Sequence, residues 1–199
     1  MKHAIMLAIL VVIIAVGCTK VQEPPAQTPA ISGTTELILN EQDLQQLGMT
    51  SNLNEQDLEQ LGITGGTNCW TDEAYSNIVD SSLGQYTVCA YLIPALNDTQ
   101  VIIQLQKFAD YEALNGSYQY DSSHLYGAKG LISENAFGDQ SRFRVNNGDD
   151  YGAEFNPPGV YYYHLWIAKD LYLIHITSSG TEEAEGQIAE IGKQILSKF

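Results

Sequence analysis

The chain has 199 residues, of which 24 are Asp or Glu and 9 are Lys or Arg, so its formal net charge at pH 7 is −15. This balance argues against binding to nucleic acid and against docking on anionic headgroups, because both need clustered basic side chains. The hydrophobic content of 44% excludes a disordered chain and predicts one folded domain with accessory segments.

The N-terminal segment, residues 1–17, predicts a secretory signal peptide. Lys2 gives a positive start, and Ala4 to Gly17 is a run of 14 residues that are apolar or glycine. A membrane-spanning helix needs roughly 20 apolar residues, so this run fits a signal better than a permanent span. An uncleaved amphiphilic anchor is the alternative. In both cases we expect the rest of the chain outside the cytoplasm.

The signal segment closes with Ala15-Val16-Gly17-Cys18. Small residues before a cysteine resemble the lipobox of prokaryotic lipoproteins, although Ala15 stands where Leu is commoner. This resemblance implies cleavage before Cys18, lipid on its thiol, and a protein anchored at the outer face of the cytoplasmic membrane or at the cell surface. Two acyl chains hold a protein stably on a membrane, whereas one holds it weakly.

Residues 18–35 predict an extended linker behind the lipidated cysteine. Pro24, Pro25 and Pro29 stand among small and polar residues with no helical or strand period. Such a composition favours a semi-rigid, extended chain. We therefore expect a tether that lifts the folded domain off the membrane.

Residues 36–66 contain an internal repeat, in which the sequence of residues 39–50 recurs at 53–64. Each copy predicts a helix of about two turns, because an asparagine stands at the N-cap and a glycine follows the last turn. Helices this short are not stable alone in water, so their leucines must pack on something. A duplicated spacer whose second copy packs on the domain edge is favoured over a helical hook for a partner.

Cys69 and Cys89 predict a disulfide bond. An even pair of cysteines in an oxidising compartment forms a bridge, and closing this loop is worth roughly 3 kcal/mol in the chain-entropy model. A metal site is the competing interpretation, but the spacing of Cys and His residues does not support it.

Residues 67–199 predict an α+β domain with an antiparallel sheet of about five to seven strands packed by a C-terminal helix. A two-sided sandwich is the alternative. The expected strands are 85–93, 100–106, 131–132, 141–146, 151–155, 160–168 and 171–178. The expected helices are 108–114, ending near Asn115-Gly116, and 181–198, capped by Thr181. The layout resembles PsbP/Mog1-type extracytoplasmic domains.

The hairpin of 160–168 and 171–178 carries the main candidate site. With Lys169-Asp170 as the turn, His164 lies across from His175. Two imidazoles at that distance can share a transition metal, although the sequence shows no third ligand. The alternative is a histidine pair that makes ordinary hydrogen bonds.

Tyr162 and Trp166 share the face of His164 and His175 and predict an aromatic surface for a sugar or a peptide. Tyr118, Tyr120, His124 and Tyr126 follow a similar aromatic pattern elsewhere in the chain. Strands also favour tyrosine for packing alone, and a helix that covers this face would leave a second core instead.

Other candidate sites are weaker. Asn146 to Asp150 is acidic and contains glycine, but a hairpin turn around Asn147-Gly148-Asp149 explains it better than a calcium loop. Asn97 and Asn115 match the glycan acceptor pattern. The chain lacks the GxSxG, HExxH, Walker A and GxGxxG motifs, so no catalytic residues and no cofactor are assigned.

The sequence therefore predicts a lipid-anchored cell-surface protein with an extracytoplasmic domain in a binding or accessory role. Its expected partners are the membrane, through the anchor, and a protein or glycan ligand. The alternative is an extracytoplasmic metal-binding protein or hydrolase that uses the face of His164 and His175.

Overall fold

The computed structural model describes residues 31–63, 67–73, 83–124, 130–146 and 157–199. The expected signal peptide, Cys18 and most of the expected linker lie outside these ranges. Within the described residues, no helix is long and apolar enough to span a membrane.

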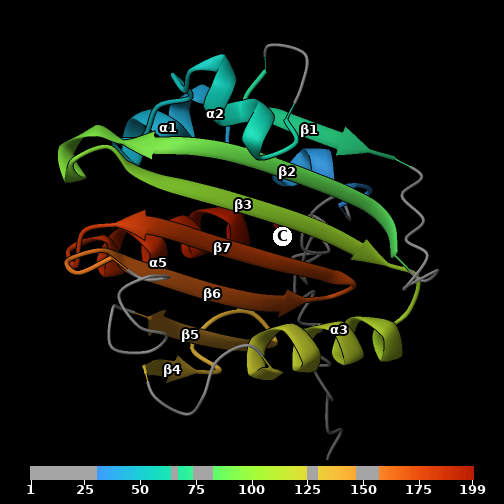
Figure 1. The fold of residues 1–199 in the computed structure, drawn as a ribbon. Coiled ribbons are helices and arrows are strands. Elements are labelled where there is room, and N and C mark those ends of the chain that lie inside the picture. Colours follow the sequence, from blue (N-terminus) through green and yellow to red (C-terminus); the bar gives the residue numbers. More distant parts are fainter. Residues whose placement is uncertain (1–30, 64–66, 74–82, 125–129, 147–156) are drawn as a thin grey trace, which may run out of the picture.

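The domain is built on one seven-stranded antiparallel sheet, which confirms the α+β prediction (Figure 1). The spatial order is β1-β2-β3-β7-β6-β5-β4. The strands are β1 (Cys69–Asp72), β2 (Leu83–Ile93), β3 (Thr99–Phe108), β4 (Leu131–Glu134), β5 (Gln140–Asn146), β6 (Tyr161–Lys169) and β7 (Tyr172–Gly180). The helices are α1 (Glu41–Gln46), α2 (Glu55–Gln60), α3 (Tyr111–His124) and α5 (Ala184–Leu196), with 3₁₀ turns η1 (Thr34–Leu37) and η2 (Pro94–Leu96).

Alternation along the strands separates the sheet into two faces. In β3, the odd-numbered Val101, Ile103 and Leu105 are buried, whereas the even-numbered residues between them are half-buried. Side chains alternate between faces along a strand, so the odd-numbered set faces one side throughout. We call the side that carries Val101 and Ile103 the covered face, and the opposite side the open face.

Helix α5 packs on the covered face, behind the sheet in Figure 1. Ile188, Ile191 and Ile195 recur at helical spacing and are fully buried in the main core. Gly192 allows a close approach, because a Cβ there would lie 2.9 Å from a methyl carbon of Leu165. The helix begins at Ala184, and its N-cap residue is Glu183. The expected cap at Thr181 is therefore wrong.

Helix α3 packs on the open face and extends well beyond its expected range. The predicted stop at Asn115-Gly116 is wrong, because the helix continues to His124. Leu114 and Tyr118 lie one turn apart, and both are buried against the sheet. This packing outweighs the local preference of asparagine and glycine to end a helix.

The two copies of the repeat lie on opposite faces of the sheet. Leu39, Leu47 and Met49 of the first copy join the main core on the covered face. Leu58 and Ile63 of the second copy join a separate cluster with residues of β2 on the open face. Between the copies, Thr50 bridges Leu92 of β2, so the segment crosses the edge of the sheet there.

The β6–β7 hairpin is shifted by two residues from its expected register. Lys169 pairs with Tyr172, which places His164 across from Thr177 and His175 across from Trp166. The predicted pairing of His164 directly with His175 is therefore wrong. An even shift keeps every residue on its expected face, so the assignment of both histidines to one face is confirmed.

The Cys69–Cys89 disulfide is confirmed, and it joins directly opposed residues of β1 and β2. The expected strand 151–155 and its turn lie outside the described residues. In the described part of the chain, β5 pairs with β4 on one side and with β6 on the other.

Candidate functional site

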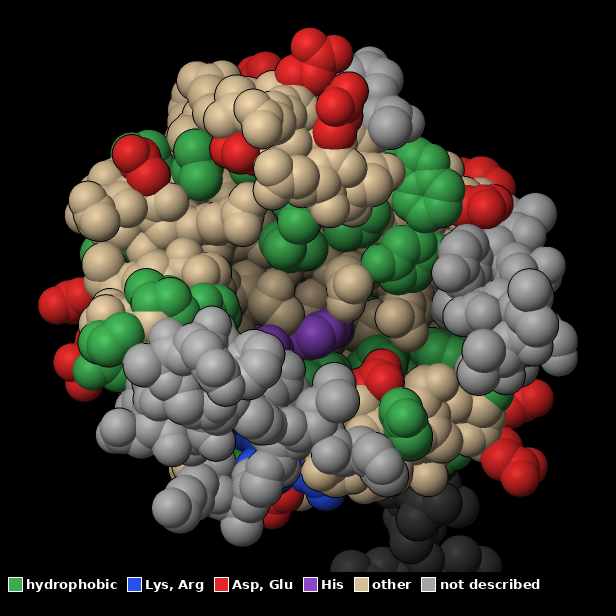
Figure 2. All heavy atoms as spheres, in the orientation of Figure 1, with side chains coloured by type: hydrophobic (Ala, Val, Ile, Leu, Met, Phe, Trp, Pro, Cys, Tyr) green, Lys and Arg blue, Asp and Glu red, His purple; other side chains and the backbone are tan. Residues whose placement is uncertain are grey.

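The open face contains a hollow with the two histidines at its bottom, as Figure 2 shows. Helix α3 packs on Trp166, Ala168 and Leu173, whereas α2 lies over Val88 and Ala90. Between these two clusters the strands carry polar side chains. Half-buried residues on this stretch of the open face are Gln100, Gln104, His164, His175 and Thr177.

A chain of hydrogen bonds links the polar side chains of four strands, β2, β3, β7 and β6. The amide nitrogen of Gln104 donates to the hydroxyl of Tyr86, at 3.0 Å, and its oxygen lies 3.0 Å from Nδ1 of His175. Nε2 of His175 lies 3.3 Å from Nδ1 of His164. The two histidines are thus in contact, although the register does not place them directly opposite.

The direction of these bonds assigns the proton on each ring. The amide oxygen of Gln104 can only accept, so Nδ1 of His175 donates to it. In a neutral ring, Nε2 of His175 then accepts from Nδ1 of His164. This assignment leaves Nε2 of His164 as an acceptor.

Both imidazoles are held in the neutral form. Burial lowers the pKa of His164 to about 4. Burial also holds the pKa of His175 well below its usual value, and the adjacent His164 lowers it further. At neutral pH the two rings therefore place no charge at the bottom of the hollow.

Trp166 packs beside the two histidines and is not exposed to a ligand. Its ring stacks on His175 with centroids 4.6 Å apart and on His164 at 5.3 Å. The side chain is only 1% exposed, because α3 covers it. The expected aromatic surface therefore does not include Trp166, whereas Tyr162 is half-buried on the open face.

The predicted metal site gains no third ligand in the described part of the chain, where no group of three His, Cys, Asp or Glu residues could hold a metal ion. Nδ1 of His175 is already occupied by Gln104. Metal binding by His164 and His175 stays a prediction.

Two aromatic residues that the sequence did not single out lie on the open face of β1 and β2. Trp70 and Tyr86 are half-buried, with ring centroids 6.0 Å apart. Their position could be inferred only after the pairing of β1 with β2 was known, because four half-buried residues give no alternation. The hydroxyl of Tyr86 links this pair to Gln104 and so to the histidines.

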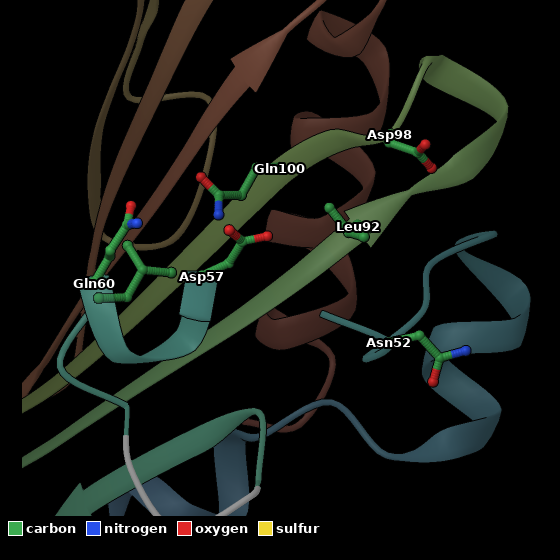
Figure 3. A pocket seen from close by; sticks show the side chains of 7 residues that line it. Asn52, Asp57, Gln60, Leu92, Asp98 and Gln100 are labelled. Atoms are coloured by element: carbon green, nitrogen blue, oxygen red, sulfur yellow. The ribbon is translucent and has the colours of Figure 1, made fainter. Parts of the chain in front are cut away.

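A pocket of about 620 Å³ lies where the second repeat copy meets the sheet (Figure 3). Asp57 and Gln60 of α2 contribute carboxylate and amide groups, and Asp98 contributes a second carboxylate from the turn before β3. The remaining lining residues are Asn52, Leu61, Leu92 and Gln100. Gln100 and Leu92 are on the open face by register, so the pocket belongs to the same side of the sheet as the histidines.

The other residues that the sequence singled out do not join this site. Tyr118 is a residue of α3 and is buried against the sheet, whereas Tyr120 of the same helix is 60% exposed. Tyr126 and residues 147–150, where a hairpin turn was expected in preference to a calcium loop, lie outside the described residues. Asn97 lies in the left-handed turn before β3, and Asn115 lies within α3.

No family model matches the chain, and no curated protein matches it either. Among solved structures, the chain is similar to the extracellular domain of PknH from Mycobacterium tuberculosis, at 13% sequence identity and a TM-score of 0.43. The match covers 80% of this chain and 96% of that chain. A score at this level supports no conclusion about function, and the lipobox and PsbP/Mog1 resemblances stay predictions.

Proposed function

We propose that this protein is a lipid-anchored extracytoplasmic binding protein that receives a partner on the open face of its sheet. Cys18 carries the anchor, and the domain that begins near residue 31 carries the binding surface. Anchoring raises the local concentration of the domain near membrane partners, so a partner can be captured without tight affinity.

The contrast between the two faces supports this proposal. On the covered face, α5 fills the space over the strands with fully buried isoleucines. On the open face, α2 and α3 leave a hollow with histidine side chains at its bottom (Figure 2), and Gln104 bonds to His175 there. Polar groups ordered by hydrogen bonds beside a concave surface are typical of a binding site.

Photo-crosslinking in intact membranes tests the binding surface. A photoreactive amino acid at Gln100, on the open face, should give a discrete adduct. The same group at Glu190, exposed on α5, is the control and should give none. Equal adduct patterns from both positions, or no adduct from Gln100, would contradict the proposal.

Replacement of Cys18 by serine tests the anchor. The variant should leave the membrane fraction or accumulate as an unprocessed precursor, because it has no thiol to carry lipid. External protease should degrade the wild-type domain on intact cells or spheroplasts. Unchanged membrane retention of the serine variant would exclude lipidation at Cys18.

A further inference from the structure

The two repeat copies have matching backbones, so residues 14 positions apart can be compared directly. In each copy an asparagine side chain caps the helix by accepting from the amide of Asp43 or Asp57. Each helix then ends at a glycine with positive φ, 60° at Gly48 and 74° at Gly62. In each copy, the residue after this glycine donates back to the carbonyl of a helical leucine, at 2.9 Å.

In the first copy and just before it, side chains of helix α5 and of the turn after it contact three residues. The ammonium of Lys198 donates to a carboxylate oxygen of Asp43 at 2.8 Å and to the carbonyl of Ile38 at 3.1 Å. The amide of Gln194 donates to the other carboxylate oxygen of Asp43 at 2.6 Å. The amide of Gln187 donates to the carbonyl of Leu47. The carboxylate of Asp43 is therefore buried with its charge compensated.

In the second copy, the three equivalent residues line the open pocket. Asp57 corresponds to Asp43 and Leu61 to Leu47, and Asn52, just before the second copy, corresponds to Ile38, just before the first. Asn52, Asp57 and Leu61 all line the pocket of about 620 Å³. Helix α5 cannot serve this copy, because it lies on the opposite face of the sheet. Among the described residues, no basic side chain forms an ion pair with Asp57.

We propose that this pocket binds a lysine side chain of a partner protein, in the place that Lys198 takes against the first copy. The inference rests on the proposed function, since the partner would arrive on the open face. The ammonium would donate to the carboxylate of Asp57. The side-chain amides of Gln60 and Gln100 would form hydrogen bonds with polar groups of the partner next to its lysine.

The charges in the pocket fit a cation. Asp57 and Asp98 supply two carboxylates to the lining, and Figure 3 shows them on α2 and on the turn before β3. The chain as a whole carries 24 acidic and 9 basic residues, which favours the approach of a positively charged partner. Leu61 and Leu92 offer apolar surface for the methylene groups of a lysine stem.

Titration of the ¹⁵N-labelled full-length chain in detergent with N-acetyl-lysine methylamide tests the proposal. The side-chain amide signals of Asn52, Gln60 and Gln100 should shift and saturate. The same probe acetylated at its ε-nitrogen, and the norleucine analogue, should bind at least tenfold more weakly, the loss expected for about one charge-assisted hydrogen bond.

Two variants of the pocket locate the ammonium. Asp57→Asn and Asp98→Asn should each weaken binding of the lysine probe, by roughly tenfold for Asp57. Asp98 has a φ of 54°, a conformation that asparagine also tolerates, so the second variant preserves the turn. The matched control is Glu55→Gln, which removes one exposed charge from the same helix outside the pocket and should leave binding unchanged.

Three outcomes would overturn the proposal: no shift of the pocket amides, equal binding of the acetylated probe, or equal losses in Glu55→Gln and Asp57→Asn. If the lysine probe fails while the photoreactive group at position 100 still gives its adduct, the open face binds a partner of different chemistry. If both fail, the binding surface itself is wrong.

Discussion

The covered and open faces belong to the same strands but differ in burial and polarity. Ile174 and Ile176 of β7 point into the main core and are fully buried, whereas His175 between them and Thr177 after them are half-buried on the other side. Along one strand, one set of alternate residues thus packs in the core, and the other set forms a polar surface. These polar residues do not lie on a fully exposed surface, because α3 and α2 pack on the same face on two sides of them.

The two faces should differ most in how far truncation of a side chain lowers the free energy of unfolding. Ile176→Ala should lower the free energy of unfolding by about 2–5 kcal/mol, because it leaves a cavity beside α5. Thr177→Ala, one residue along on the open face, should cost less than about 1 kcal/mol. Urea denaturation measures both changes. Equal losses would show that the open face is as tightly packed as the covered one.

Protonation of His164 on the open face should lower the free energy of unfolding at acidic pH. His164 has a pKa of about 4 in the folded chain against about 6.5 when unfolded, so the unfolded chain binds more protons between these values. Stability is therefore full above pH 6.5 and falls as the pH drops toward 4, by about 3 kcal/mol for this group. Urea denaturation between pH 7 and 4.5 measures the slope.

The control for the pH experiment removes the titrating rings. His164→Gln combined with His175→Gln should flatten the dependence in this window, because glutamine keeps polar groups but does not ionise. The same slope in the double variant would assign the acid sensitivity to carboxylates elsewhere.

The ion pair that closes the first repeat copy should have an intermediate effect. Lys198→Met should cost about 1–3 kcal/mol, because the Asp43 carboxylate is only 8% exposed and would lose its cation. Lys193→Met removes a pair with Glu190 in which both side chains are about 60% exposed, and should cost less than about 0.5 kcal/mol. Thermal unfolding of the two variants compares the pairs directly.

The smallest effect is expected where the second copy lacks such a pair. Asp57→Asn should change the free energy of unfolding by less than about 0.5 kcal/mol, whereas Asp43→Asn should destabilise by about 1–3 kcal/mol. The two positions are equivalent in sequence, so thermal unfolding compares a carboxylate that bonds to Gln194 and Lys198 with one that does not. A large loss in Asp57→Asn would mean that its carboxylate already serves the fold.

The sequence was sufficient for β2, β3, β5, β6 and β7 and for the presence of the C-terminal helix, because their apolar residues alternate or recur over long segments. It could not set the length of α3, since the contacts of Leu114 and Tyr118 with the sheet decide where that helix ends. The sequence also could not fix the β6–β7 register, because every shift by an even number of residues keeps each side chain on the same face. Strand β1 has only four residues, all half-buried, and gave no period to recognise.

The candidate site was predictable in part for a related reason. His164 and His175 were assigned to one face, and diagonal neighbours in a sheet still lie within reach of long side chains, so their contact survives the wrong register. The hollow could not be predicted, because it depends on where α2 and α3 stop. The repeat was visible as a pattern, but its division between two faces depends on the crossing at Thr50.

The path of the N-terminal segment has a mechanical consequence. A pulling force at residue 31 acts first on contacts such as the bond from Lys107 Nζ to Ser32, at 2.5 Å, and the 2.9 Å bond between the hydroxyls of Thr34 and Thr87. Residues 31–68 can peel away and lengthen the chain by roughly 130 Å at full extension. The load then passes through the Cys69–Cys89 bond into β2, so this bond stops further unravelling from that end.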